Sequence, residues 1–372
     1  MTVPNGNEAS AASEFTNLCA DKGLLKRPQG LKDEDVVDGF TDEVTLLRFL
    51  QANKLDPSKA LEQFQQALDF QTDNDAIRLY DLISVSEFEE TRAVYPHWTG
   101  RCDRSGRPLL MFDVSAIGKE GLAHWRKTRD MPKSIIPGGP ANADSTASAS
   151  TSASASPPQS PNMAQRALTY FDYYPRFVLP LCSAAHGKPV TNCVYLVDAG
   201  PLYMRQAWDL REFARDISWI LAMCFPETIY RCYCCNVPSF LARFWSIIKS
   251  FIDPATASKI RFLPRSDAYD TLKADIEHDD IPTCLGGGFQ FETGMLPDLD
   301  DNIRRALEWS GTQVDLPPGP IKWVQTPAPA ESGTGARKAV ATGTADGVQR
   351  AVEVATLRTP FLSSFCDARQ GW

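Results

Sequence analysis

Four short apolar runs limit what this chain can fold into more than any other feature. The runs are LLMFDV (109–114), CVYLVD (193–198), YRCYCCNV (230–237) and IRFL (260–263). Each has the length and the apolar or aromatic content that is typical of a buried strand.

Helical periodicity fills the intervals between the later runs. Apolar residues recur there every three or four positions, as they do along one face of a helix. One stripe comprises Leu210, Phe213, Ile217, Ile220 and Leu221, and the other Phe240, Leu241, Phe244, Ile247, Ile248, Phe251 and Ile252. This alternation of strand and helix predicts an α/β domain with a mostly parallel sheet.

The residues that precede this pattern are typical of helices. The segment TDEVTLLRFLQANKLD offers Thr41 as an N-cap, and Asp56 with Pro57 starts a second helix. We therefore predict an N-terminal helical module over residues 1–100, followed by the α/β domain over residues 101–295.

Two stretches have a composition that cannot bury a core. Residues 137–161 are rich in Ser, Ala and Pro, and residues 296–372 include TPAPAESGTGARKAVATGTADG. Such segments usually stay unstructured. We predict a disordered surface insert at 137–161 and a largely disordered C-terminal extension over 296–372.

Charge and hydropathy exclude several classes of protein. The net charge is −8 and the sequence pI is about 5.2, which argues against nucleic acid as the main partner. The sequence has no run of eighteen apolar residues, and MTVPNGNEAS lacks the features of a secretion signal. The ten cysteines are scattered without metal-ligand spacing. We expect a cytoplasmic protein with reduced thiols and no metal.

Sequence motifs for catalysis are missing. The four histidines lie in no known nucleophile or metal motif, and the sequence has no GxSxG, HExxH or P-loop. The glycine cluster LGGGF (285–289) follows Pro282 and reads as a turn. We therefore predict that the protein is not an enzyme and needs no cofactor.

The segment FIDPATASKIRF (251–262) carries a polar combination suited to phosphate. Asp253 and Pro254 predict the start of a short helix, on which Thr256 and Lys259 share one face. A hydroxyl, an ammonium and a helix N-terminus together could hold a phosphate. The alternative, which local evidence alone favours, is a capped surface turn with a solvated lysine.

Two neighbouring segments bear on this choice. The stretch FLARFWSIIKSF (240–251) has a wide aromatic and aliphatic stripe beside cationic residues, so it is either a core helix or a lid that touches a bilayer. In CFPETIYR (224–231), Glu227 is either a solvated loop carboxylate, an acceptor for sugar or inositol hydroxyls, or a latch that pairs with Lys259.

These segments, in this order, resemble the CRAL-TRIO lipid-binding family, and especially the fungal phosphatidylinositol/phosphatidylcholine transfer proteins of the secretory pathway. The resemblance covers about residues 40 to 292. It is carried by TLLRFLQANKLDPSKA, DRSGRPLLMFD, FPETIYRCYCCNVPSFLARFWSIIKSFIDPATASKI and IPTCLGG.

The resemblance implies a sheet that floors an apolar pocket, closed by a mobile gating helix over residues 239–251. It also implies that Glu227, Thr256 and Lys259 bind a lipid head group. The chain has Asn53 where family members often carry an arginine that supports the inositol phosphate site, and we include Asn53 in the site. For the apolar pocket and gate it implies Val194, Leu196, Leu221, Met223, Phe225, Phe240, Phe244, Ile247, Ile248 and Phe251.

The expected function is phospholipid binding and transfer or presentation, with phosphatidylinositol as the first choice of ligand. Expected partners are a transient membrane surface at endomembranes and a lipid kinase. Phosphatidylcholine fits less well, because the positions that resemble the family's choline site are mostly apolar. Those positions are Thr99, Leu110, Asn192, Val194 and Leu221. A sterol, a prenoid or a porphyrin is therefore an alternative ligand for the same pocket.

Overall fold

The structure is a computed structural model of the chain, and it describes residues 6–36, 39–136, 160–240, 245, 249–326 and 335–358. The predicted insert at 137–161 lies outside these residues except for its last two positions. None of the helices in the described ranges is long and apolar enough to cross a membrane.

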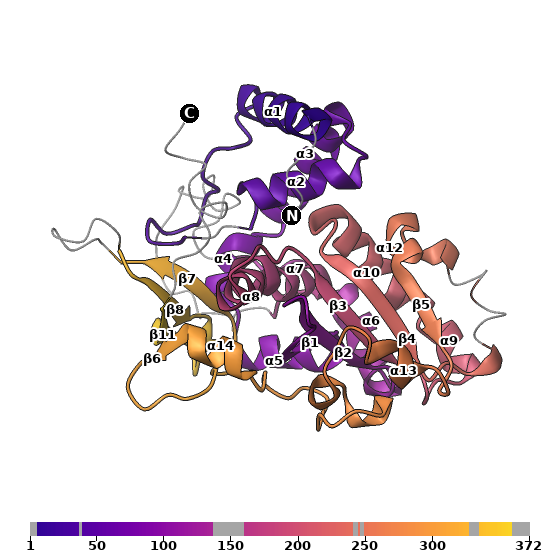
Figure 1. Cartoon of the computed structure of the whole chain (residues 1–372). Coiled ribbons are helices and arrows are strands. Elements are labelled where there is room, and N and C mark those ends of the chain that lie inside the picture. The colour runs from indigo at the N-terminus through magenta and orange to yellow at the C-terminus, as the bar shows by residue number, and fades with distance from the viewer. Residues whose placement is uncertain are drawn as a thin grey trace, which may run out of the picture.

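A five-stranded sheet in the order β1-β2-β3-β4-β5 forms the centre of the molecule (Figure 1). Its strands are β1 (His97–Cys102), β2 (Pro108–Asp113), β3 (Cys193–Asp198), β4 (Ile229–Cys235) and β5 (Ile260–Leu263). Strand β1 runs antiparallel to β2, and each later strand is parallel to its neighbour. The prediction of an α/β domain with a mostly parallel sheet is confirmed, and β1 begins slightly before the expected boundary at residue 101.

Helices precede the sheet and connect its strands. The N-terminal set is α1 (Gly6–Asp21), α2 (Glu43–Ala52), α3 (Pro57–Asp73), α4 (Ala76–Leu82) and α5 (Val85–Val94). The later ones are α6 (Lys119–Arg129), α7 (Met163–Tyr173), the π-helix η3 (Tyr174–Val178), α8 (Leu179–His186), α9 (Met204–Asp209), α10 (Arg211–Cys224), α12 (Pro254–Lys259), α13 (Ala268–Leu272) and α14 (Asp301–Ala306).

Aspartates cap several of these helices and so fix where they begin. Asp42 accepts a hydrogen bond from the Thr45 N–H and caps α2, so the expectation that Thr41 is the cap was wrong by one residue. Asp56 caps α3 in the same way and Pro57 is its first residue, as the sequence indicated.

The two faces of the sheet bury different cores. On one face, side chains such as Leu110 and Tyr195 pack with α7, α8 and α10 in the main core. On the other face, Leu109, Val194 and Leu196 pack with α13 and the residues after it in a smaller core. Because side chains alternate along a strand, the three central strands β2, β3 and β4 contribute to both cores.

The prediction that residues 296–372 are largely disordered was wrong for the part that the structure describes. Four strands form an antiparallel sheet in the order β6-β11-β8-β7, and β9 pairs with β10. Their bounds are β6 (Leu307–Trp309), β7 (Ile321–Gln325), β8 (Arg337–Ala341), β9 (Thr344–Ala345), β10 (Val348–Gln349) and β11 (Val352–Leu357). Asp346 and Gly347, both at positive φ, make the two-residue turn between β9 and β10. The polar, glycine-bearing stretch was therefore a hairpin signal.

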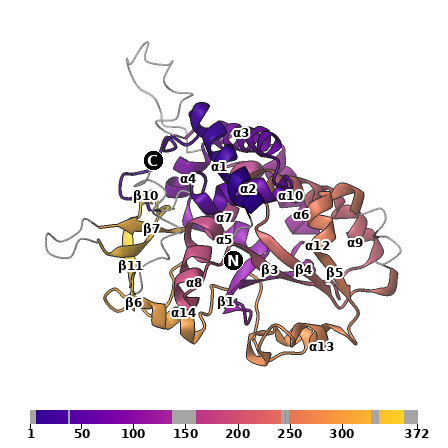
Figure 2. The ribbon, with the colours of Figure 1, turned by 45° about the horizontal axis from the view of Figure 1, so that its top comes forward.

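This second sheet packs onto the first domain (Figures 1 and 2). The Trp323 ring stacks on Phe177 of the π-helix, with ring centroids 5.3 Å apart. The Lys322 ammonium is buried and lies 2.7 Å from both an Asp35 and an Asp81 carboxylate oxygen. The extension is thus held by an apolar contact and by a buried charge cluster.

Candidate functional site

A pocket of about 100 Å³ opens where α10 ends and β4 begins, beside α12. Its lining combines apolar and polar side chains from four parts of the chain. The lining residues are Ala52, Gln63, Leu221, Ala222, Phe225, Pro226, Glu227, Thr228, Ile229, Asp253, Ala255, Thr256 and Lys259. Three of the four predicted head-group residues, Glu227, Thr256 and Lys259, therefore meet in one pocket.

The turn that carries Glu227 has an unusual backbone. Glu227 adopts φ 57°, in the left-handed region that side chains other than glycine rarely occupy. Pro226 precedes it, and the Thr228 hydroxyl donates a 2.6 Å hydrogen bond to the Phe225 carbonyl, which closes the turn. A carboxylate held in a strained turn is typical of a functional position.

Glu227 and Lys259 form an ion pair across the pocket. The Lys259 Nζ lies 2.8 Å from a Glu227 carboxylate oxygen, and their side chains are 21% and 29% exposed. This geometry matches the latch that the sequence suggested for Glu227. Because both ends touch solvent, the pair contributes little stability and can exchange partners.

The two polar side chains of α12 have different surroundings. The Thr256 hydroxyl makes no hydrogen bond to any residue that the structure describes, so it is available to a ligand. The first-turn N–H groups are less available, because the Asp253 carboxylate accepts from the Thr256 N–H at 2.9 Å. A phosphate here would therefore contact the side chains of Thr256 and Lys259 rather than the end of this short helix.

Asn53 reaches the site only through another residue. Its side-chain amide donates 2.7 Å to the Gln63 carbonyl oxygen, and the Gln63 amide donates 2.9 Å to the Ala222 carbonyl. Gln63 lines the pocket and Asn53 does not. Sequence reasoning missed Gln63, since a polar residue on an amphipathic helix normally faces solvent.

The apolar positions divide into two groups. Leu221 and Phe225 line the pocket, and Met223 is half-buried against the main core. Val194 and Leu196 do not belong with them, because they pack in the smaller core on the opposite face of the sheet. The prediction that Val194 and Leu196 line the pocket was therefore wrong. Every position of CVYLVD up to Val197 is apolar, so the sequence pattern could not show which residues lie on which face of the sheet.

A row of half-buried apolar side chains crosses the opposite face of the sheet from the one on which Val194 and Leu196 lie. The row is formed by Phe112, Val197, Cys234 and Phe262, which are register neighbours on β2, β3, β4 and β5. The Trp245 ring contacts Phe262 edge-on, with centroids 4.7 Å apart, so this one described residue of the predicted gate's middle lies on this face. We call these four residues the apolar row.

Most of the predicted gate lies outside the described residues. Phe244, Ile247 and Ile248 are among the undescribed positions, and the Phe251 side chain is not described either. Phe240 is half-buried at the start of the segment.

The five positions that resemble a choline site do not form one site. Leu110 packs in the main core and Val194 in the smaller core, on opposite faces of the sheet. The buried Thr99 hydroxyl donates to the Leu109 carbonyl at 3.1 Å. The argument against phosphatidylcholine that rested on these positions therefore loses its basis.

Comparisons with known proteins cover the region that contains this pocket. A model of the CRAL/TRIO domain family matches residues 93–287. The SEC14 cytosolic factor of Candida glabrata is 24% identical over 271 residues, which are 72% of this chain and 78% of that protein. The SEC14 cytosolic factor of Yarrowia lipolytica is 23% identical over 292 residues, 78% of this chain and 51% of that protein.

A plant relative and a solved structure have similar coverage. The phosphatidylinositol/phosphatidylcholine transfer protein SFH11 of Arabidopsis thaliana is 23% identical over 283 residues, covering 72% of this chain and 66% of its own length. The crystal structure of Sfh5 aligns with a TM-score of 0.47 at 12% identity, covering 73% of this chain and 85% of that one.

Proposed function

The chain belongs to the CRAL/TRIO domain family, and from that membership we propose that it is a non-enzymatic carrier that binds a phospholipid and transfers or presents it between membranes. Relatives named as SEC14 cytosolic factors and as a phosphatidylinositol/phosphatidylcholine transfer protein support this assignment. We propose phosphatidylinositol as the first ligand.

The observation that carries the proposal is the Glu227–Lys259 pair, 2.8 Å apart, in a pocket that also holds the Thr256 hydroxyl. A phosphodiester would compete with Glu227 for the Lys259 ammonium and accept a hydrogen bond from Thr256. The released Glu227 carboxylate would then accept hydrogen bonds from inositol hydroxyls. In this scheme the lipid-free protein keeps Glu227 and Lys259 paired with each other until the head group binds.

The acyl chains would lie over the apolar row of Phe112, Val197, Cys234 and Phe262. Moving them from a bilayer to a protein interior changes little apolar exposure, since both environments exclude water. Selectivity would then depend on the polar end, which is why three side chains carry most of the discrimination.

Membrane contact is proposed at α9, which lies on the same side of the molecule as β5 and α12 in both views (Figures 1 and 2). Three large side chains there are about half exposed: Tyr203 at 54%, Met204 at 51% and Trp208 at 48%. The Arg211 guanidinium lies 4.3 Å above the Trp208 ring, a pairing suited to the boundary of a bilayer. We propose that the protein visits endomembranes peripherally and presents its lipid there to a lipid kinase.

The test is phosphatidylinositol transfer between donor and acceptor vesicles by the full chain and by Lys259→Ala. We expect transfer to fall at least tenfold, because the phosphate loses its cation, while the melting temperature stays within a few degrees. Lys273→Ala serves as the control, because it removes another lysine from an ion pair, the one that Lys273 forms with Asp270 on the surface. Unchanged transfer by Lys259→Ala would overturn the head-group assignment.

A further inference from the structure

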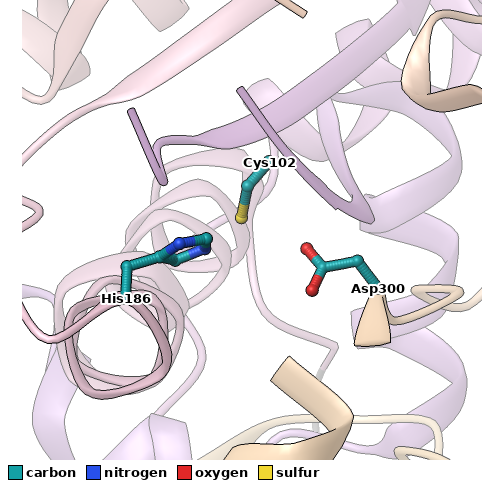
Figure 3. A group of neighbouring side chains, drawn as sticks. All are labelled: Cys102, His186 and Asp300. Carbon is teal, nitrogen blue, oxygen red and sulfur yellow. The ribbon is translucent and has the colours of Figure 1, made fainter. Parts of the chain in front are cut away.

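A second cluster of chemically reactive side chains lies away from the pocket. Cys102 ends β1, His186 ends α8, and Asp300 directly precedes α14. One ligand atom of each, a sulfur, a ring nitrogen and a carboxylate oxygen, lies within 4.8 Å of the other two. Figure 3 shows the three side chains pointing toward a common space from three different elements.

A fourth donor adjoins the cluster. The Cys182 sulfur lies 3.8 Å from the Cys102 sulfur, and both thiols are buried. Cys182 precedes His186 by one turn of α8, so the two side chains share one face of the helix. The Cys182 sulfur thus adjoins Cys102 but lies outside the group of three whose ligand atoms are all within 4.8 Å of one another.

The backbone around the cluster makes room for the imidazole. Gly106 adopts φ +77°, and a Cβ atom there would lie 2.7 Å from the His186 Cγ. Only glycine permits this approach, so the turn between β1 and β2 holds the ring in place. Asp300 is fixed as well, because its Oδ1 caps α14 at 2.9 Å from the Ile303 nitrogen and its own N–H donates to the Gly100 carbonyl.

One nitrogen of the cluster lacks a hydrogen-bond partner among the described residues. The His186 Nε2 is buried, and within the described part of the chain it has no hydrogen-bond partner. Burying a polar nitrogen without a partner is unfavourable, because the nitrogen loses its hydrogen bonds to water. A bound cation would supply the missing partner.

We propose that Cys102, Cys182, His186 and Asp300 bind one zinc ion. Thiolate, imidazole and carboxylate are the ligands that zinc takes in four-coordinate sites, whereas calcium and magnesium require oxygen ligands. Bond lengths of about 2.0–2.3 Å set ligand atoms about 3.3–3.8 Å apart in a tetrahedron. The 3.8 Å between the sulfurs already fits. The ligand atoms of Cys102, His186 and Asp300, which lie within 4.8 Å of one another, would close by up to about 1.5 Å on binding, and the Cys182 side chain would turn toward the other two to complete the site.

The ion would join parts of the chain that are distant in sequence. Cys102, Cys182 and His186 lie within the residues matched to the CRAL/TRIO family, and Asp300 lies beyond them. The zinc would therefore fasten the start of the C-terminal extension to β1 and α8. The spacing of cysteines and histidines in the sequence could not predict this site, because three separate segments supply its ligands.

The experiment uses the full chain, reduced and freed of metal with a chelator, and titrated with Co²⁺ as a spectroscopic substitute for zinc. We expect one equivalent to bind, with a strong thiolate-to-cobalt band in the near ultraviolet and the visible absorption of a tetrahedral site. Zinc should displace the cobalt and remove both signals. Weak absorption typical of six-coordinate cobalt would overturn the proposal even without any variant.

Variants then test the ligands individually. His186→Gln and Asp300→Asn should each weaken cobalt binding at least tenfold. Two matched controls should bind cobalt as tightly as the parent does. They are His278→Gln, which changes a histidine that is hydrogen-bonded to Tyr269, and Cys284→Ser, which removes an exposed thiol. Equal affinity in His186→Gln and the parent would contradict the assignment.

Discussion

Replacing Glu227 by glycine and by alanine separates the free-energy cost of its left-handed backbone conformation from the contribution of its carboxylate to lipid binding. The residue holds φ 57°, a conformation that costs a side-chain-bearing residue about 1–2 kcal/mol and costs glycine nothing. Glycine loses about 0.5–1 kcal/mol more entropy on folding than alanine does. Both variants lose the Glu227–Lys259 pair, so that loss cancels between them.

We therefore expect Glu227→Gly to be more stable than Glu227→Ala by about 1 kcal/mol. The assay is the urea midpoint of the full chain, with the unfolding slope compared between variants. Glu277, whose φ is −67° and which pairs with Arg104 at 2.8 Å, is the matched control. There, glycine should be the less stable of the two replacements.

The same two variants test the function of the carboxylate. Both should transfer phosphatidylinositol about tenfold more slowly, as expected for a lost hydrogen bond to a charged group worth about 1.5 kcal/mol. If Glu227→Ala equals Glu227→Gly in stability, the strain argument is refuted. If either variant transfers at the parental rate, Glu227 does not contact the head group.

Three further changes have defined outcomes. Lys322→Ala should destabilise the fold by about 3–5 kcal/mol, because Asp35 and Asp81 would stay buried without their cation; a loss below 1 kcal/mol in urea unfolding would contradict this. Burial lowers the pKa of His97 to about 4, and its Nε2 accepts from the Gly294 N–H at 3.1 Å. The folded state therefore favours neutral His97, so stability should be full above pH 6.5 and fall by up to about 3 kcal/mol as the pH drops through 4. His97→Gln should flatten that part of the profile, and an unchanged profile would refute the assignment. Trp208→Ala should lower the fraction of protein that co-sediments with anionic vesicles severalfold relative to Trp309→Ala, a variant in the second sheet. Equal binding by the two variants would contradict the assignment of α9 as the membrane contact.

The central sheet and the polar site could be predicted because each depends on local pattern. Apolar runs of strand length determined β2 to β5, and the spacing of Thr256 and Lys259 on a capped turn determined their shared face. A Glu227–Lys259 latch was one of several readings that the residues left open, and the family resemblance implied that Glu227, Thr256 and Lys259 share one site; spacing could not decide this, because the two segments are distant in sequence.

Other features depended on information that a single strand does not carry. Val194 and Leu196 were assigned to the wrong face, since a strand buried on both sides gives no period-2 signal. The second sheet was missed because its short strands alternate weakly and its turn residues, Asp346 and Gly347, resemble those of a linker. The Cys102–His186–Asp300 cluster arises only when three distant segments fold together.

Mass spectrometry of the lipid that co-purifies with the full chain from eukaryotic cells tests the central claim most directly. The account predicts one phosphatidylinositol for each chain of the parent protein and strong depletion of that lipid from Lys259→Ala, with Lys273→Ala as loaded as the parent. A sterol, a prenoid or a porphyrin in place of the phospholipid, or equal phosphatidylinositol in Lys259→Ala, would contradict it.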